Sequence, residues 1–114
     1  MVSLFSYGTL RQREVQFATY GRELEGVADT LGGYRLASLI ISDPRVVEIS
    51  GKPVHMIARA SGASNDRIDG VVFEISEAEL AATDHYEVDV YARVEVTLES
   101  GRTAWAYVGK PLRG

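Results

Sequence analysis

Short apolar runs, separated by glycine, proline and polar residues, follow one another along the sequence and predict a domain rich in β-strand. The clearest alternation lies at residues 91–98, where Ala92 and Val96 fall on one side and Arg93 and Glu95 on the other. Strands are expected at residues 2–7, 26–31, 34–41, 68–75, 91–98 and 103–108, with shorter candidates at 45–49 and 54–60.

Turn-forming residues lie between these runs. The pair Gly32-Gly33 predicts a hairpin between the runs at 26–31 and 34–41. A second hairpin is expected at residues 99–102, and Asp43-Pro44 indicates a turn.

Helical patterns occur at residues 11–20, ahead of the stop signal Gly21, and at residues 76–86. The second begins with Ser76 and Glu79 in the spacing of a capping box. The two helices do not alternate regularly with the strands, which disfavours a doubly wound parallel sheet. The expected fold is α+β, a small mixed β-barrel or curled sheet of six or seven strands with two short helices, in a single domain over residues 1–114.

Composition excludes several functions. The formal net charge is −4 and no stripe of Lys or Arg occurs, so a nucleic-acid partner is not expected. No apolar stretch approaches the roughly 20 residues that span a bilayer, and no basic leader precedes an apolar segment. The absence of cysteine removes disulfides, thiol catalysis and thiolate metal sites, and a cytoplasmic location is expected.

The two histidines, His55 and His85, lie far apart with no companion at a metal-ligand spacing. We expect each to be a surface or structural residue, and we expect no metal and no cofactor. A catalytic acid or base in this chain is therefore expected to be a carboxylate.

The first candidate for chemistry is the sequence SYGTLR at residues 6–11. A glycine directly after a strand permits a sharp turn or the close approach of a ligand. Successive amides of such a turn can hold an anion. The alternative interpretation is an ordinary strand that ends in a glycine turn, with Tyr7 in the core.

The second candidate is residues 82–96. Leu80, Asp84 and Glu87 share one face of the predicted helix, and Leu80 is its best core anchor. Glu87 is then expected at the inner edge of the helix end, partly desolvated and with a raised pKa, as a general base or acid requires. The alternative is a solvated Glu87 just past the helix that pairs with Arg93 or with no partner. For Asp84, local hydrogen bonding near a helix end is expected.

A weaker feature is formed by Tyr91, Arg93, Trp105 and Tyr107, on alternating faces of two strands that are expected to be adjacent. These side chains either line a pocket, with hydroxyls that orient a substrate, or fill a core.

Together these stretches resemble the gamma-glutamylcyclotransferase-like family, over residues 4–108. The resemblance rests on the order and spacing of Tyr7-Gly8-Thr9-Leu10, the strand at 69–75, Asp84-His85-Tyr86-Glu87, Tyr91-Ala92-Arg93 and the aromatic strand at 105–108. One departure is Thr83, where the family often has leucine, and weaker helix packing is expected there.

The resemblance implies a cavity between the Tyr7–Leu10 turn and the family's catalytic glutamate, which maps onto Glu87. It implies intramolecular aminolysis: the α-amine of a γ-glutamyl amine or amino acid attacks the γ-carbonyl, and 5-oxoproline and a free amine are released without a cofactor. Substrate contacts are expected from Tyr7, Gly8, Thr9, Leu10, Tyr91 and Tyr107.

Several points stay open from the sequence. The turn amides stabilise either the developing oxyanion or the substrate carboxylate. A non-catalytic small-molecule-binding or assembly domain of the same fold, or a module of a larger enzyme, is the alternative function. The amine half of the substrate and the oligomeric state are not indicated.

Overall fold

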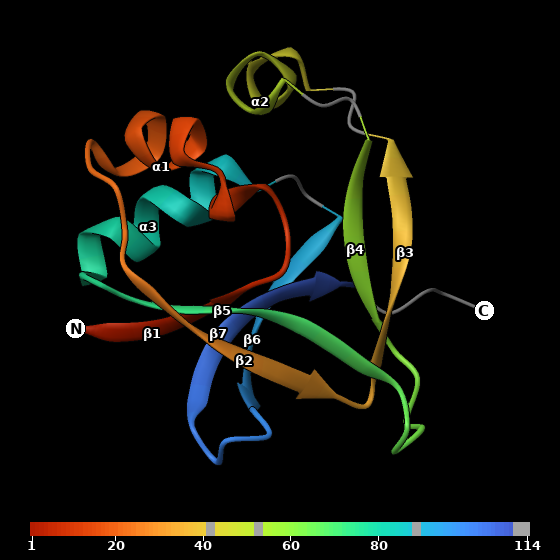
Figure 1. The fold of residues 1–114 in the computed structure, drawn as a ribbon. Helices are drawn as coiled ribbons and strands as arrows, with labels where there is room; N and C mark the ends of the chain where they lie inside the picture. The colour runs from red at the N-terminus through yellow and green to blue at the C-terminus, as the bar shows by residue number, and fades with distance from the viewer. Residues whose placement is uncertain (41–42, 52–53, 88–89, 111–114) are drawn as a thin grey trace.

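A five-stranded mixed sheet forms the centre of the computed structural model, which describes residues 1–40, 43–51, 54–87 and 90–110 (Figure 1). Its strand order is β2-β5-β1-β7-β6, and β1 and β7 are its parallel pair. A separate antiparallel ribbon pairs β3 with β4. The strands are β1 (Val2–Ser6), β2 (Gly26–Gly32), β3 (Tyr34–Ile40), β4 (Val54–Ala60), β5 (Arg67–Ile75), β6 (Tyr91–Thr97) and β7 (Thr103–Gly109).

Three α-helices and one 3-10 turn complete the described part of the chain: η1 (Thr9–Arg11), α1 (Arg13–Tyr20), α2 (Pro44–Ser50) and α3 (Glu77–Tyr86). The α1 helix ends at Gly21, which adopts the left-handed conformation with φ 71°. The predicted capping box of α3 is confirmed, because Ser76 and Glu79 exchange both hydrogen bonds. None of the described helices is long and apolar enough to cross a membrane.

The α+β class is therefore confirmed, but three details of the prediction were wrong. Strands β2 and β3 flank Gly33 without pairing, because β2 pairs with β5 and β3 with β4. Residues 45–49 are helical, since Asp43 caps α2 through the Arg45 amide, and Pro44 is favourable in a first helical turn. The described strands form an open sheet and a ribbon, and not a closed barrel.

Both faces of the central sheet are covered, which explains the apolar sequence of β1. Leu4 belongs to a core with Val15 and Leu80 of the helices, and Phe5 belongs to a second core with Ala58 of β4. Leu4 and Phe5 are both at most 1% exposed. The sheet thus lies between α1 and α3 on one side and the β3–β4 ribbon on the other (Figure 1).

Thr83 connects α3 to α1 through its buried side chain. Its side chain is fully buried, and its hydroxyl donates to the Glu79 carbonyl at 2.8 Å. The same hydroxyl forms a 2.6 Å hydrogen bond with the Tyr20 hydroxyl of α1. A leucine at this position would leave the buried Tyr20 phenol without this partner.

Candidate active site

Strand direction brings the distant candidate residues to one edge of the sheet. Because β1 and β7 are parallel, Tyr7 after β1 and Tyr107 near the end of β7 lie at the same edge. The antiparallel β6 begins there with Tyr91. Helix α3 ends at Tyr86, shortly before β6, and so carries Glu87 to the same place.

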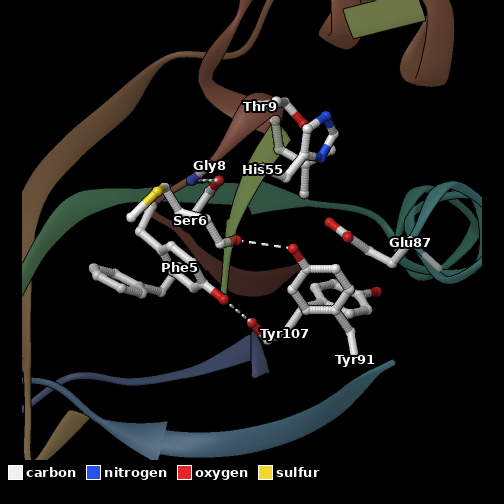
Figure 2. Close-up of a pocket in the computed structure, with 11 residues that line it drawn as sticks. Phe5, Ser6, Gly8, Thr9, His55, Glu87, Tyr91 and Tyr107 are labelled. Atoms are coloured by element: carbon white, nitrogen blue, oxygen red, sulfur yellow. Dashed lines mark hydrogen bonds between the residues drawn. The ribbon is translucent and has the colours of Figure 1, made fainter. Parts of the chain in front are cut away.

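A small cavity, partly open to solvent, lies at this edge (Figure 2). All seven site residues that the sequence predicted line it: Tyr7, Gly8, Thr9, Leu10, Glu87, Tyr91 and Tyr107. Phe5, Ser6, His55 and Met56 complete the lining.

Glu87 is the first residue beyond α3. Its N–H still donates to the Thr83 carbonyl at 3.0 Å, while its extended backbone (ψ 141°) ends the helix. The side chain points into the cavity toward Tyr91 (Figure 2). Burial raises the pKa of the Glu87 carboxyl to about 8, and no cation or donor in the described part of the chain offsets this effect. Arg93, the partner of Glu87 in the alternative interpretation, pairs instead with Asp84, with Nε to Oδ1 at 2.9 Å.

The Glu87 carboxylate affects the pKa of the tyrosine hydroxyls around the cavity. The Tyr7, Tyr91 and Tyr107 hydroxyls all have raised pKa values, mainly because they are buried and in part because a charge on Glu87 opposes a phenolate nearby. These three groups therefore stay protonated at neutral pH and act only as neutral hydrogen-bonding groups.

Hydrogen bonds fix the orientation of the three tyrosines. The Tyr7 hydroxyl donates to the Tyr107 carbonyl at 2.6 Å and accepts from the Ala58 amide at 2.9 Å, so it ties β7 to β4. Tyr91 donates to the Met56 carbonyl at 2.8 Å. The Tyr107 hydroxyl donates to Asp84 Oδ1 at 2.6 Å, which leaves its oxygen lone pairs free to accept.

The glycine turn (residues 8–10) faces the cavity with backbone groups. The Arg11 and Gln12 amides donate to the Gly8 and Thr9 carbonyls, at 3.1 and 2.9 Å. The turn and cap hydrogen bonds described for this segment use neither the Thr9 nor the Leu10 N–H as donor. The Thr9 hydroxyl shares a 2.6 Å hydrogen bond with the Tyr86 hydroxyl, which connects the turn to the end of α3.

No packing contact requires a glycine at position 8. Its φ is −125°, and an added Cβ would meet no atom within 4 Å. Packing thus does not explain the glycine, while its ψ of −146° lies outside the regular helical and extended regions, a conformation that glycine tolerates best.

Sequence reasoning missed His55 and Met56 as cavity residues. His55 is buried, as a structural histidine would be, and its Nε2 lies 3.1 Å from the Ser50 hydroxyl of α2. The strand pattern at 54–60 was visible, but its proximity to the glycine turn depends on long-range packing. Tyr91, Arg93, Trp105 and Tyr107 occupy equivalent register positions and share one face of β6–β7, not the alternating faces we expected.

The fold and the site define an α+β protein in which a desolvated carboxylate and a glycine turn line one cavity. The family model for gamma-glutamyl cyclotransferase, AIG2-like, matches residues 4–113, and the chain belongs to this family. A search of curated proteins gave no significant match.

Solved structures share the fold. A structure described as gamma-glutamyl cyclotransferase aligns with a TM-score of 0.73 at 16% identity, over 96% of this chain and 66% of its own. An uncharacterized Pyrococcus horikoshii protein aligns with a TM-score of 0.65 at 19% identity, over 100% of this chain and 83% of its own. An Arabidopsis thaliana solution structure aligns with a TM-score of 0.65 at 22% identity, over 95% of this chain and 61% of its own. The chain thus spans less than two thirds of the Arabidopsis protein, and these likenesses show the fold alone.

Proposed function

We propose that the protein is a γ-glutamyl cyclotransferase-type enzyme that converts a γ-glutamyl amine or amino acid into 5-oxoproline and the free amine. The observation that carries the proposal is that one cavity is lined by both the desolvated Glu87 carboxylate and the glycine turn (Figure 2). Family membership supports the same reaction class.

In this mechanism the nucleophile belongs to the substrate. The α-ammonium gives up one proton, its nitrogen forms a bond to the γ-carbon, and it gives up a second proton as the ring closes. The amide bond to the leaving amine breaks, and the leaving nitrogen takes up both protons and departs as an ammonium. Glu87 carries these protons as general base and then as general acid. The cavity holds the chain of the substrate folded, so that amine and carbonyl meet in one molecule.

The pKa of Glu87 suits this proton transfer. Burial raises it to about 8, which brings it much closer to the pKa of an α-ammonium than the ordinary glutamate value is. The transfer of a proton from the ammonium to Glu87 is then less unfavourable in free energy. An exposed glutamate with a pKa of about 4.3 would be a much weaker base toward the same ammonium.

The remaining cavity groups are assigned to the glutamyl half of the substrate. The glycine turn donates amides either to the γ-carbonyl oxygen as it becomes an oxyanion or to the α-carboxylate. Tyr107 accepts from the α-ammonium through its free lone pairs, and Tyr91 bounds the space beside Glu87.

The test is the release of 5-oxoproline from a panel of γ-glutamyl amines and γ-glutamyl amino acids. We expect turnover by the wild type and a loss of at least about a hundredfold in kcat in Glu87→Gln, the size typical of a general base. A matched control is Glu95→Gln, an exposed glutamate of β6 that does not line the cavity. Equal turnover by wild type and Glu87→Gln would refute the assigned role.

A further inference from the structure

One of the two edges of the β3–β4 ribbon has no partner strand. The β4 edge faces the central sheet, because Tyr91 donates to the Met56 carbonyl at 2.8 Å and Arg59 Nη1 donates to the Lys110 carbonyl at 2.9 Å. The β3 edge lies at the margin of the molecule (Figure 1), and no described strand other than β4 pairs with β3. An unpaired edge of this kind is a template for another strand.

Hydrogen bonds of β4 show which backbone groups of β3 point to this free edge. The Ala58 N–H donates to the Tyr7 hydroxyl at 2.9 Å, so it points away from β3. In an antiparallel pair, opposite residues direct their backbone groups either toward each other or both away. Leu36 is opposite Ala58, so its N–H and C=O point to the free edge. By alternation, Ser38 and Ile40 present their backbone groups in the same direction.

Two further contacts agree with this assignment. The Met56 carbonyl, opposite Ser38, accepts from the Tyr91 hydroxyl and so also points away from β3. Just before β3, the Gly33 carbonyl accepts from the Ser61 N–H at 2.9 Å, which directs the odd-numbered positions toward β4. The even-numbered residues of β3 therefore carry a row of outward donors and acceptors.

The same row carries exposed apolar side chains. Leu36 is 43% exposed and Ile40 is 78% exposed, and both lie on one face of the ribbon because they are four positions apart in one strand. β3 contains neither lysine nor proline, with which exposed edges are usually protected. The edge strand β2 differs, because the turn after β6 reaches it: the Glu99 N–H donates to the Thr30 carbonyl at 2.9 Å.

We propose that β3 pairs in antiparallel fashion with β3 of a second copy of this chain, about a two-fold axis at Ser38. In this register Leu36 lies opposite the partner's Ile40, and Ser38 lies opposite the partner's Ser38. The outward backbone groups of all three positions then find partners, and the two ribbons form one four-stranded sheet, β4-β3-β3-β4.

Two properties of the ribbon favour a second copy as the occupant. Leu36 and Ile40 are equally far from Ser38, so a two-fold axis there matches an apolar side chain with an apolar side chain twice. The chain has a net charge of −4, but β3 and β4 contain no Asp or Glu, so two copies meet through a surface without carboxylate repulsion. Arg35, the charged residue of β3, lies three positions from the axis in each copy and on opposite sides of it.

A single pair of strands is a small interface. Stable interfaces usually bury about 1,000 Å² or more in total, and smaller ones are weak and transient. We therefore expect a dimer that forms at micromolar concentrations and dissociates on dilution. In sedimentation velocity from about 1 to about 300 μM, the mean mass should rise from 12.5 kDa toward twice that value. A purified chain that stays monomeric throughout would leave the edge to a different partner and overturn the proposal.

Two variants of β3 test the edge itself. Ile40→Lys places a charge opposite the partner's Leu36, and Ser38→Pro removes an N–H that β4 does not use, a change that an edge strand tolerates. Each should raise the dimer Kd at least about tenfold, while circular dichroism and thermal unfolding show a folded monomer. Val27→Lys is the matched control, because Val27 is an exposed apolar residue of the other edge strand, β2. If Ile40→Lys and Val27→Lys dimerise alike, β3 is not the interface.

A single introduced thiol locates the axis, because the chain contains no cysteine. In the proposed dimer Ser38→Cys places two thiols opposite each other at a Cα separation of about 5.5 Å, which suits a disulfide. Mild oxidation should therefore convert this variant into a covalent dimer much faster than Thr97→Cys, an exposed position on the edge strand β6. The proposed register is wrong if Ser38→Cys stays monomeric or if the two variants crosslink at the same rate.

Discussion

Asp84 Oδ1 accepts hydrogen bonds from two side chains of the neighbouring β6–β7 pair, the Tyr107 hydroxyl at 2.6 Å and Arg93 Nε at 2.9 Å. Arg93 and Tyr107 are register partners, and the Arg93 guanidinium also stacks on Trp105 at 4.6 Å. Asp84, three residues before Glu87, thereby fixes the cavity tyrosine while Glu87 enters the cavity.

Tyr107→Phe should reduce kcat/KM about five- to tenfold, the value of one hydrogen bond to the substrate ammonium. The protein should lose little stability, because Asp84 keeps its Arg93 partner at an exposed site. Steady-state kinetics and urea unfolding measure the two effects. An unchanged kcat/KM would show that the phenol does not contact the substrate.

Glu87 should make the protein less stable as the pH rises. Its folded pKa of about 8 lies above the unfolded value near 4.5, so the folded state holds the proton more tightly. The resulting stabilisation is fully present below pH 4.5 and is lost as the pH rises toward 8. Between pH 5.5 and 8.5 we expect the wild type to lose on the order of 3 kcal/mol relative to Glu87→Gln.

Urea unfolding of both proteins at the two pH values measures this difference. A carbon NMR titration of glutamate carboxyls should in addition show one signal that titrates near pH 8 and is missing in Glu87→Gln. Parallel stability curves for the two proteins would mean that the carboxylate is not desolvated.

Two glycines beside the site should respond in opposite ways to alanine. An added Cβ at Gly8 meets no atom within 4 Å, so Gly8→Ala should change the free energy of unfolding by less than about 1 kcal/mol. The same change should lower kcat/KM at least about tenfold, because the methyl group fills space that the substrate needs. At Gly70, the Cβ would lie 2.5 Å from the Ser6 carbonyl and 2.6 Å from the Phe5 ring. Gly70→Ala should therefore cost about 2 kcal/mol or more.

Tyr7→Phe should reduce stability more than Tyr91→Phe. The first change leaves the Ala58 amide and the Tyr107 carbonyl without their buried partner, at a cost of about 2 kcal/mol. The second removes an exposed hydrogen bond to the Met56 carbonyl and should cost about 0.5 kcal/mol. Thermal unfolding compares them, and equal losses would contradict the bridging role of Tyr7.

Local signals in the sequence predicted much of the fold. The capping box at Ser76 and the alternation at residues 91–98 both correspond to observed elements. The helix at Pro44 was missed because the apolar residues after Asp43-Pro44 were interpreted as a strand. The Gly32-Gly33 hairpin was predicted from turn chemistry, but β2 pairs with β5 and β3 with β4, and pairing over that range is not visible in a local pattern.

In the candidate site, too, the sequence predicted local features and missed contacts between distant residues. Helical spacing placed Glu87 on the inward face with Leu80, and the raised pKa agrees with that position. No local pattern showed that Arg93 pairs with Asp84 or that His55 reaches the cavity, because these contacts depend on strand order. The roles of the cavity residues in turnover remain predictions.

The position of β1 between β5 and β7 affects how the protein is made. Among the described strands, β1 is translated first and its partner strands tens of residues later, and its parallel contact with β7 forms only after nearly the whole described chain has been made. Pairing over such sequence distances is slow to form. The candidate site, which contains Tyr107 of β7, is then among the last parts of the described chain to assemble.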